Sequence, residues 1–373
     1  MTCLVETRYG VMEFLEGDSV VSRSLELYGE WAQDEIALMG RLVRPGDVVM
    51  DVGAFLGTHT LALARLVGPG GRVHGFEPRH AIRSVLAGNV ERNSLSQVQV
   101  HGCALGEQQT ELRIEAIDTE DARNFGGLAI EQLAAEAKVA VETIVVKTLD
   151  QFGFDRIDML KIDAEGMEAA VLTGGRQTLL AHQPWVFAEC NDLRGGTQTW
   201  SILRELGYLV FGVVTSAFSP NNFKGEKRNI FGEAAEVSLL AAPQRHVAQI
   251  AQLREACVLA EIDSLDALAL LLLHKPQYVD EVWAHLRAAE VLGLDFLTPA
   301  SRKLQARLDE ASTLNAKLDE AATLQARAAG EAAEELAELR RACRQLRADN
   351  QALKSYLPSS LLYRWQRLRQ SFR

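Results

Sequence analysis

One short segment near the start of the chain constrains the fold more than any other. Residues 48–60, VVMDVGAFLGTHT, form an apolar run that ends in an acid and then breaks into glycines. The three apolar residues before Asp51 are typical of a strand buried on both faces of a parallel sheet. Gly53 and Gly57 allow a tight turn and a close approach of the backbone to a ligand. The segment therefore predicts the first crevice of a doubly wound α/β fold, where such folds bind their ligands.

Strand-like and helix-like patterns then alternate from about residue 46 to residue 242. Such alternation predicts a mainly parallel sheet with helices on both faces. The expected strands after the first one cover residues 72–78, 98–105, 111–115, 141–149, 157–166 and 184–189. The expected helices between them cover residues 80–93 and 167–181.

Net charge, cysteine content, the N-terminal residues and the longest apolar run limit the class of protein. The net charge of -11 over 373 residues argues against a nucleic-acid-binding protein. The five cysteines are far apart and odd in number, which suits a reducing compartment better than a disulfide framework. The N-terminus carries acids where a signal peptide needs a basic start, and the apolar run 265–274 is too short to span a bilayer. We expect a cytoplasmic protein.

The chain is expected to contain four parts. Residues 1–243 form the α/β domain with an N-terminal extension, and residues 244–300 are helical in composition without a recognisable motif. Residues 301–357 are rich in Ala, Leu, Glu, Arg and Gln, and their last part carries apolar residues at alternating steps of three and four. This spacing predicts a coiled coil, and Asn350 at a core position favours a parallel homodimer. One solvated helix packed on the main domain is the alternative.

The last segment, residues 358–373, is expected to be a basic amphipathic tail. Pro358 ends the preceding helix, and Leu361, Trp365, Leu368 and Phe372 then share one face of a new one. The arginines lie off that face. Such a helix can bind an anionic membrane surface, which would place the protein at the inner face of the membrane, or it can bind a groove on a partner protein.

Two further positions at strand ends are typical of a nucleotide site. Glu77 ends the second expected strand and can accept hydrogen bonds from the two hydroxyls of a ribose. Cys103 and Ala104 end the third, where backbone groups can bracket an adenine ring. The alternative for Glu77 is a solvated acid at a strand end. The dehydrogenase spacing G-x-G-x-x-G is absent, because this loop reads Asp51-x-Gly53-x-x-x-Gly57.

The region from about Tyr9 to Pro243 resembles the FkbM-type family of S-adenosylmethionine-dependent methyltransferases, which mostly methylate hydroxyls of sugars and polyketides. The matching pieces are LELYGEWAQDE, PGDVVMDVGAFLGTHT, GFEP, ALGE, NFGG, LKIDAEGMEAAVLTGG and NIFG. The resemblance implies a Rossmann-like doubly wound methyltransferase sheet and S-adenosylmethionine as the cofactor. It places Asp51, Gly53 and Gly57 in the methyl-donor loop and Glu77 at the ribose. Phe55 stands where the family usually has a small polar residue, typically asparagine.

Four residues are candidates for the chemistry of methyl transfer to a hydroxyl, which needs a general base within hydrogen-bond reach. Asp163 and Glu165 follow an interior strand, Glu189 ends a neighbouring strand, and His59 lies near the donor loop. Strand-end acids also cap helices, and a histidine in a first helical turn is often structural. The three acids can alternatively hold a divalent metal.

Two loops are candidates for choosing the acceptor of the methyl group. Residues 124–127 and 219–232 have loop compositions and can select the acceptor, or they are ordinary surface loops. The expected function is O-methylation of a hydroxyl, most naturally of a sugar in a cell-surface glycan or a lipid-linked precursor, or of a polyketide-like acceptor. A nucleotide-dependent oxidoreductase lacks its motifs here. The remaining alternative is a coiled-coil scaffold with an inactive methyltransferase-like domain.

Overall fold

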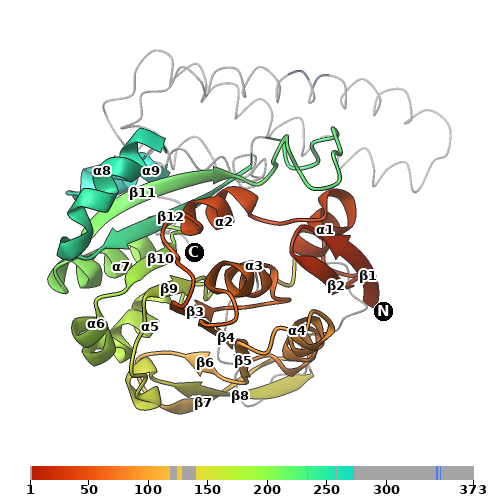
Figure 1. The fold of residues 1–373 in the computed structure, drawn as a ribbon, viewed down its shortest axis with the longest axis horizontal. Helices are drawn as coiled ribbons and strands as arrows, with labels where there is room; N and C mark the ends of the chain where they lie inside the picture. The colour runs from red at the N-terminus through yellow and green to blue at the C-terminus, as the bar shows by residue number, and fades with distance from the viewer. Residues whose placement is uncertain are drawn as a thin grey trace. The chain divides into compact units, whose positions relative to one another are not determined.

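The computed structural model describes residues 2–117, 124–127, 140–232, 234–256 and 259–272, together with Ala342 and Gln345. The chain divides into two compact units, Met1–Lys275 and Pro276–Arg373. Apart from Ala342 and Gln345, which are helical, the expected coiled coil and tail lie outside the described residues. The other helices and strands of the described residues belong to the first unit (Figure 1).

A twisted sheet of eight strands forms the centre of this unit, in the order β13-β11-β12-β10-β9-β3-β4-β5. Strands β5, β4, β3, β9 and β10 pair in parallel, whereas β12 and β13 run antiparallel to their neighbours. This arrangement confirms the expected doubly wound, mainly parallel fold. The parallel strands are β3 (Val48–Val52), β4 (Arg72–Phe76), β5 (Val98–His101), β9 (Met159–Ile162) and β10 (Trp185–Glu189). The others are β11 (Leu209–Ser216), β12 (Ala235–Ala242) and β13 (Ala260–Glu261).

Successive strand residues enter two separate apolar cores, one on each face of the sheet. Val49 belongs to the core beneath α3 (Thr58–Val67), and Met50 belongs to the opposite core. This alternation follows from the two-residue period of a strand. The first core also contains α2 (Gln33–Met39), α4 (His80–Arg92) and α8 (Val247–Ala256). The second contains α5 (Glu168–Gly174), α6 (Arg176–His182), α7 (Leu193–Glu205) and α9 (Leu265–Leu272).

Two sequence expectations need correction at boundaries. The single helix expected over residues 167–181 is two helices, α5 and α6, because the chain breaks at a pair of glycines. A Cβ atom on Gly174 would lie 2.0 Å from the carbonyl oxygen of Gly106, so this turn packs directly on another backbone. The expected strand 98–105 is also interrupted after β5. Its end, β6 (Ala104–Leu105), joins a small sheet with β7 (Thr110–Glu115) and β8 (Val141–Lys147) in the order β6-β8-β7.

An N-terminal extension packs beside the first crevice. It consists of the hairpin β1 (Thr2–Thr7) and β2 (Gly10–Leu15), then α1 (Val21–Tyr28) and α2. Two asparagines, one in α4 and one directly after it, hold the outer edge of β2. Asn93 accepts from the N–H of Val11 and donates to its carbonyl, and Asn89 makes the same pair of bonds with Glu13.

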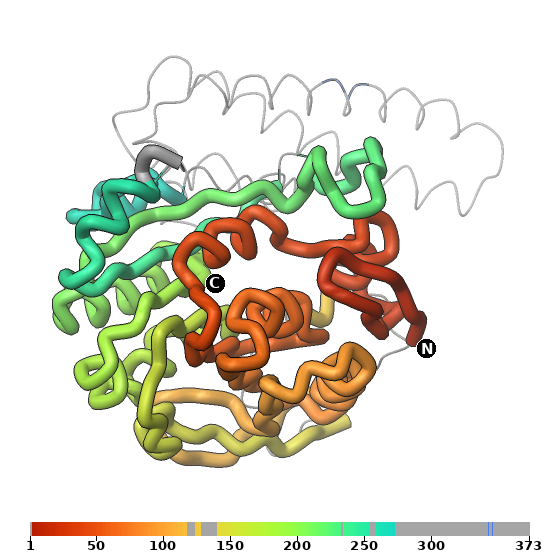
Figure 2. Tube along the Cα trace, viewed as in Figure 1, coloured from red at the N-terminus to blue at the C-terminus, as the bar shows by residue number. Residues whose placement is uncertain are grey.

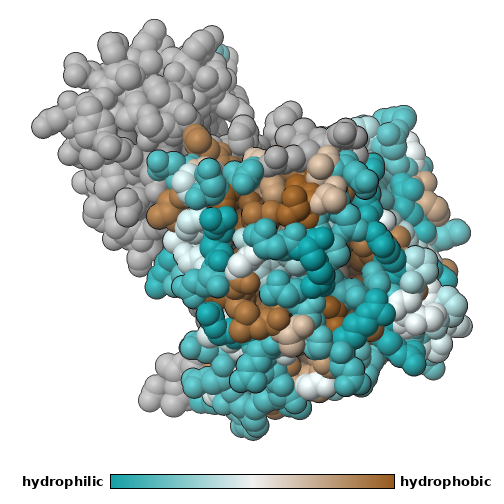
Figure 3. Space-filling view, turned by 60° about the vertical axis from the view of Figure 1, so that its left-hand side comes forward, coloured by the Kyte–Doolittle hydropathy of each residue, from teal (hydrophilic) through white to brown (hydrophobic). Residues whose placement is uncertain are grey.

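The described part of residues 244–300 belongs to the same unit. Strand β13 pairs with β11, and the Trp200 indole of α7 donates to the Ile262 carbonyl. Two 3-10 helices, η1 (Leu149–Phe152) and η2 (Gln244–His246), complete the elements in the described part of this unit. The surface visible in Figure 3 is largely hydrophilic, with separate apolar patches. Within the described ranges, no helix is both long and apolar enough to span a bilayer.

Candidate active site

The candidate site lies where the strand order reverses. The chain leaves β3 and builds β4 and β5 on one side, and it later adds β9 and β10 on the other. The loops after β3 and β9 touch at this switch point. Gly53 has a φ of +76°, and a Cβ atom there would lie 1.6 Å from the carbonyl oxygen of Asp163. Only glycine fits, so the two loops form one continuous floor at the carboxyl edge of the sheet.

Gly57 shapes the other end of the loop that follows β3. It precedes α3 as the residue at the helix N-terminus, with a φ of +95°. A Cβ atom on Gly57 would lie 2.7 Å from Leu86, so helix α4 packs closely against this turn. Between the glycines, Phe55 also has a positive φ, of 46°. A non-glycine residue in this region stores strain, which is common where a backbone is shaped for a ligand.

Glu77, directly after β4, presents a buried carboxylate beside this loop. Its Oε1 accepts from the backbone N–H of Arg79 at 2.9 Å, and its Oε2 accepts from that of Phe55 at 3.2 Å. Burial raises the pKa of Glu77 to about 7, although the two amides and the Arg79 guanidinium oppose that rise. The carboxylate is therefore fixed in orientation by one amide of the donor loop and one amide of its own loop.

Cys103 and Ala104 lie at the next strand end, on the same half of the crevice. Both side chains are buried, and the Glu77 N–H donates to the carbonyl of His101, which joins the ends of β4 and β5. Glu77, Cys103 and Ala104 thus flank β3 on one side. The candidate acids flank it on the other.

Asp51 is fully buried beneath the floor. The register of β3 and β9 places it opposite Lys161, whose Nζ lies 3.1 Å from Asp51 Oδ1, and Thr60 donates to Oδ2 at 2.6 Å. Lys161 also donates to the Gly53 carbonyl at 3.3 Å. Burial alone would lower the pKa of Lys161, but Asp51 and Asp163 outweigh it and raise that pKa. The ammonium is therefore a permanent positive charge under the loop.

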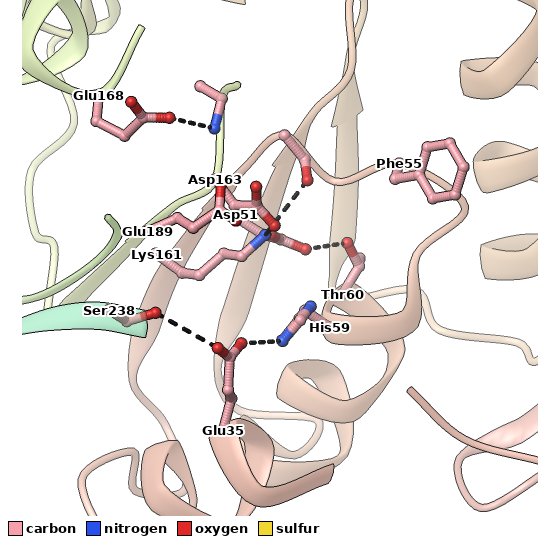
Figure 4. Close-up of polar contacts among 12 residues, drawn as sticks. Glu35, Asp51, Phe55, His59, Thr60, Lys161, Asp163, Glu168, Glu189 and Ser238 are labelled. Carbon is pink, nitrogen blue, oxygen red and sulfur yellow. Dashed lines mark hydrogen bonds and ion pairs between the residues drawn. The ribbon is translucent and has the colours of Figure 1, made fainter. Parts of the chain in front are cut away.

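Three acids gather above this ammonium. Asp163, Glu165 and Glu189 each offer a carboxylate oxygen within 4.8 Å of the other two. Lys161 Nζ lies 3.4 Å from Asp163 Oδ2. Burial favours the neutral form of Asp163, but Lys161 and a hydrogen bond from Glu189 prevail and lower its pKa. The expected convergence of the three acids is present, and Lys161 already supplies one positive charge to it. Figure 4 shows Lys161 beside Asp51 and Asp163.

The loop that carries Glu165 is held by Glu168. Its Oε1 accepts from the backbone N–H of Ala164 at 3.0 Å and from that of Gly166 at 3.1 Å. Glu165 itself has a φ of 50°, another strained non-glycine position. Glu168 thus stabilises the backbone that brings Glu165 towards Asp163 and Glu189.

His59, in the first turn of α3, lies below the acids. Its Nε2 is 3.3 Å from Oε2 of Glu35, on α2. Oε1 of Glu35 accepts from the hydroxyls of Thr215 and Ser238, each at 3.4 Å. Figure 4 shows the imidazole between Glu35 and the group formed by Asp51 and Thr60.

Sequence reasoning missed two members of this site, Lys161 and Glu35. Lys161 carried a signal, because a lysine within an interior strand must find a buried partner and lies on the same face as Asp163 two residues later. Glu35 carried none, since its partners come from α3, β11 and β12.

A doubly wound sheet with a glycine loop at the switch point, and a fixed carboxylate at the neighbouring strand end, defines a Rossmann-like enzyme that binds a nucleotide-containing cofactor. Residues 51–210 match the methyltransferase FkbM domain. The chain is 30% identical over 213 residues to 31-O-demethyl-FK506 methyltransferase FkbM of Streptomyces tacrolimicus, covering 49% of this chain and 81% of that protein. It is 28% identical over 199 residues to Methyltransferase 1 of Beauveria bassiana, covering 47% of this chain and 77% of the relative. The chain belongs to the FkbM methyltransferase family.

A crystal structure of methyltransferase FkbM from Methylobacillus flagellatus KT is also similar, with 19% identity and a TM-score of 0.35. The match covers 52% of this chain and 43% of the chain in the crystal structure.

The methyl donor of the family is S-adenosylmethionine. The residues of the β3 loop and of the strand ends on the β4 side fit this cofactor. The Glu77 carboxylate is held by two backbone amides, one of them from the glycine loop, in the position that suits ribose hydroxyls. Gly53 and Gly57 carry no side chain, so the backbone at these two positions of the loop is open to close approach. Cys103 and Ala104 continue the same edge of the sheet, beside Glu77.

Proposed function

We propose that this methyltransferase modifies a hydroxyl of a polyhydroxylated acceptor, a sugar of a cell-surface glycan or of its lipid-linked precursor. The observation that carries the proposal is the group of Asp163, Glu165 and Glu189 at the carboxyl edge of the sheet. Carboxylates accept hydrogen bonds from hydroxyls, and three of them converging on one point suit an acceptor with several neighbouring hydroxyls.

The residues divide the work between the two sides of β3. Glu77, Gly53, Gly57, Cys103 and Ala104 hold the cofactor, which supplies a methyl group on a positively charged sulfonium. The acids on the other side orient the acceptor oxygen towards that methyl group, and one group within reach takes up the proton. Asp51 and Lys161 act from below by fixing the loops that carry both sides.

Two loops at the carboxyl edge complete the proposed acceptor site together with the N-terminal extension. The backbone N–H of Phe125 donates to Asp18 Oδ1 at 3.0 Å. Tyr28, the last residue of α1, binds the loop that follows β11. Its hydroxyl donates to the carbonyl of Arg228 and accepts from the N–H of Ile230. Figure 2 shows this loop running beside α1. The extension therefore supports both segments that we propose to select the acceptor.

The test is to incubate the full chain with labelled S-adenosylmethionine and with glycans, lipid-linked glycan precursors and simple polyols. Methylation of a hydroxyl acceptor, absent with Glu77→Ala, is the expected result. Transfer to an amine or thiol acceptor, with none to hydroxyls, would contradict the proposal. Failure to bind S-adenosylhomocysteine at all would instead favour an inactive domain on a coiled-coil scaffold.

The same three acids make a metal-assisted reaction the second candidate. Oxygen ligands within 4.8 Å of one another suit Mg²⁺ or Mn²⁺. Loss of methyl transfer in a chelator, restored by added magnesium or manganese, is the outcome expected from that candidate. Full activity in the chelator is the outcome expected if Lys161 supplies the only cation needed.

A further inference from the structure

The buried pair of His59 and Glu35 is not explained by binding of the cofactor. Both side chains are over nine-tenths buried, with exposed fractions of 6% and 9%. They come from α3 and α2, so the pair joins the donor-loop helix to the N-terminal extension. A buried carboxylate is costly without a partner, and His59 is the basic group that Glu35 contacts within the described residues.

The contacts of Glu35 determine which imidazole nitrogen carries the proton. Oε2 lies 3.3 Å from Nε2 of His59, and Nε2 makes no hydrogen bond within the described residues. An ionised carboxylate at this position favours the tautomer with a proton on Nε2. Nδ1 then carries the lone pair, and it makes no hydrogen bond with the described residues. The 3.3 Å contact is an ion-pair distance that can tighten when ligands bind.

The surroundings of His59 also distinguish it from Asp163 as a proton acceptor. Asp51 lies on β3 and Lys161 on β9. Asp163 and Glu189 belong to the acid group above, and Glu35 lies below. A charged His59 lowers the pKa of Asp163, so the two groups are close enough to interact. Asp163 is held in its ionised form by Lys161, which makes it a weak base.

We propose that His59 is the proton acceptor of the methyl transfer and that Glu35 is its positioning residue. This inference rests on the proposed O-methylation. The hydroxyl oxygen forms the bond to the methyl carbon, the carbon–sulfur bond breaks with its electron pair on sulfur, and the hydroxyl proton moves to Nδ1. The resulting imidazolium is stabilised by the Glu35 carboxylate, which the hydroxyls of Thr215 and Ser238 hold in place.

Kinetics of three full-length variants test the proposal. His59→Gln should lower kcat by about 10² to 10⁴ with the affinity for S-adenosylhomocysteine unchanged by calorimetry. Glu35→Gln keeps the shape of the side chain and removes its charge. It should lower kcat by a smaller factor with little change in KM, and the acid limb of the pH profile should move to lower pH. Glu35→Asp should restore part of the rate.

Glu30→Gln is the matched control, because Glu30 is also buried in the N-terminal extension and pairs with Arg8 at 2.7 Å. It should leave the pH profile unchanged. An equal shift of the acid limb in Glu30→Gln and Glu35→Gln, or wild-type kcat in His59→Gln, would overturn the proposal.

A measurement without an acceptor separates this inference from the proposed function. Nitrogen-15 NMR of the eight histidines, with His59 assigned by its absence in His59→Gln, should show the neutral ring protonated on Nε2. Protonation on Nδ1 would reject the inference. If the wild-type chain methylates no hydroxyl while His59 has the expected tautomer, the proposed function has failed and the pair remains as described.

Discussion

At the scale of single residues, the site combines charges that the fold holds in fixed forms. Lys161 is kept positive by Asp51 and Asp163, whereas Glu77 is pushed by burial towards its neutral form, with a pKa of about 7. The ribose of the cofactor would find a carboxyl group poised between two states. This difference leads to a prediction for each of the two residues.

Cofactor affinity should depend on the ionisation of Glu77. The pKa of Glu77 in the folded protein lies above its ordinary value of 4.5. The contribution of Glu77 to folding stability is therefore full below about pH 4.5 and is lost as the pH rises through about 7. Ribose hydroxyls donate to the ionised form, so affinity for S-adenosylhomocysteine should increase from about pH 6 to about pH 8. Calorimetry should show a weaker and flatter profile for Glu77→Gln, lower by about 1 to 3 kcal/mol at the upper end. An unchanged affinity in an intact fold would remove Glu77 from the site.

Lys161 should contribute to stability mainly by neutralising Asp51. Lys161→Met leaves a fully buried carboxylate without its counter-charge, and we expect a loss of about 3 to 5 kcal/mol in the free energy of unfolding, measured by urea denaturation. The double variant with Asp51→Asn should recover much of this loss. Simple additivity of the two single changes would show that the pair is not coupled.

At the scale of elements, the junction of the loops after β3 and β9 determines the shape of the crevice. Gly53→Ala would place a Cβ atom 1.6 Å from the Asp163 carbonyl oxygen, so the two loops must separate. Gly46→Ala is a matched control, because Gly46 also has a positive φ, of +89°, and has no atom within 4 Å of its Cβ position. The control should cost about 1 to 2 kcal/mol from backbone strain alone. Gly53→Ala should cost more and should also weaken binding of S-adenosylhomocysteine. An equal loss of folding stability in the two variants would mean that the loops after β3 and β9 can separate without strain.

Local sequence patterns predicted the strands and strand-end acids of this region. They did not predict which side chains from distant segments contact one another. The apolar run before Asp51, the acid after β4, the acids after β9 and the acid that ends β10 are each visible within a few residues of sequence. The opposition of Asp51 and Lys161 depends on the register of β3 against β9, which no local pattern encodes. Glu35 reaches His59 only because α2 folds back over α3. Helix α5 ends at Gly174, where a Cβ atom would lie 2.0 Å from the carbonyl oxygen of Gly106, a residue of another loop.

At the scale of the whole molecule, the sequence of residues 301–357 still predicts a parallel dimer. Asn350 at a core position can pair with its copy in a two-stranded coil. Light scattering should therefore give a dimer for the full chain and a smaller assembly for a chain ending at Lys275, the end of the first unit. A full-length monomer at micromolar concentration would contradict this prediction. A trimer would mean that the leucines, and not Asn350, set the stoichiometry.

The two asparagines that hold the outer edge of β2 have a consequence for the ageing of the protein. Deamidation of Asn93 or Asn89 would replace an N–H donor with an acceptor, which would then face the carbonyl of Val11 or Glu13. The carbonyl groups at the outer edge of the hairpin would lose the donors that now satisfy them. An unpaired strand edge is a template for another chain, so chemical damage at these two positions would convert a covered edge into a site of aggregation.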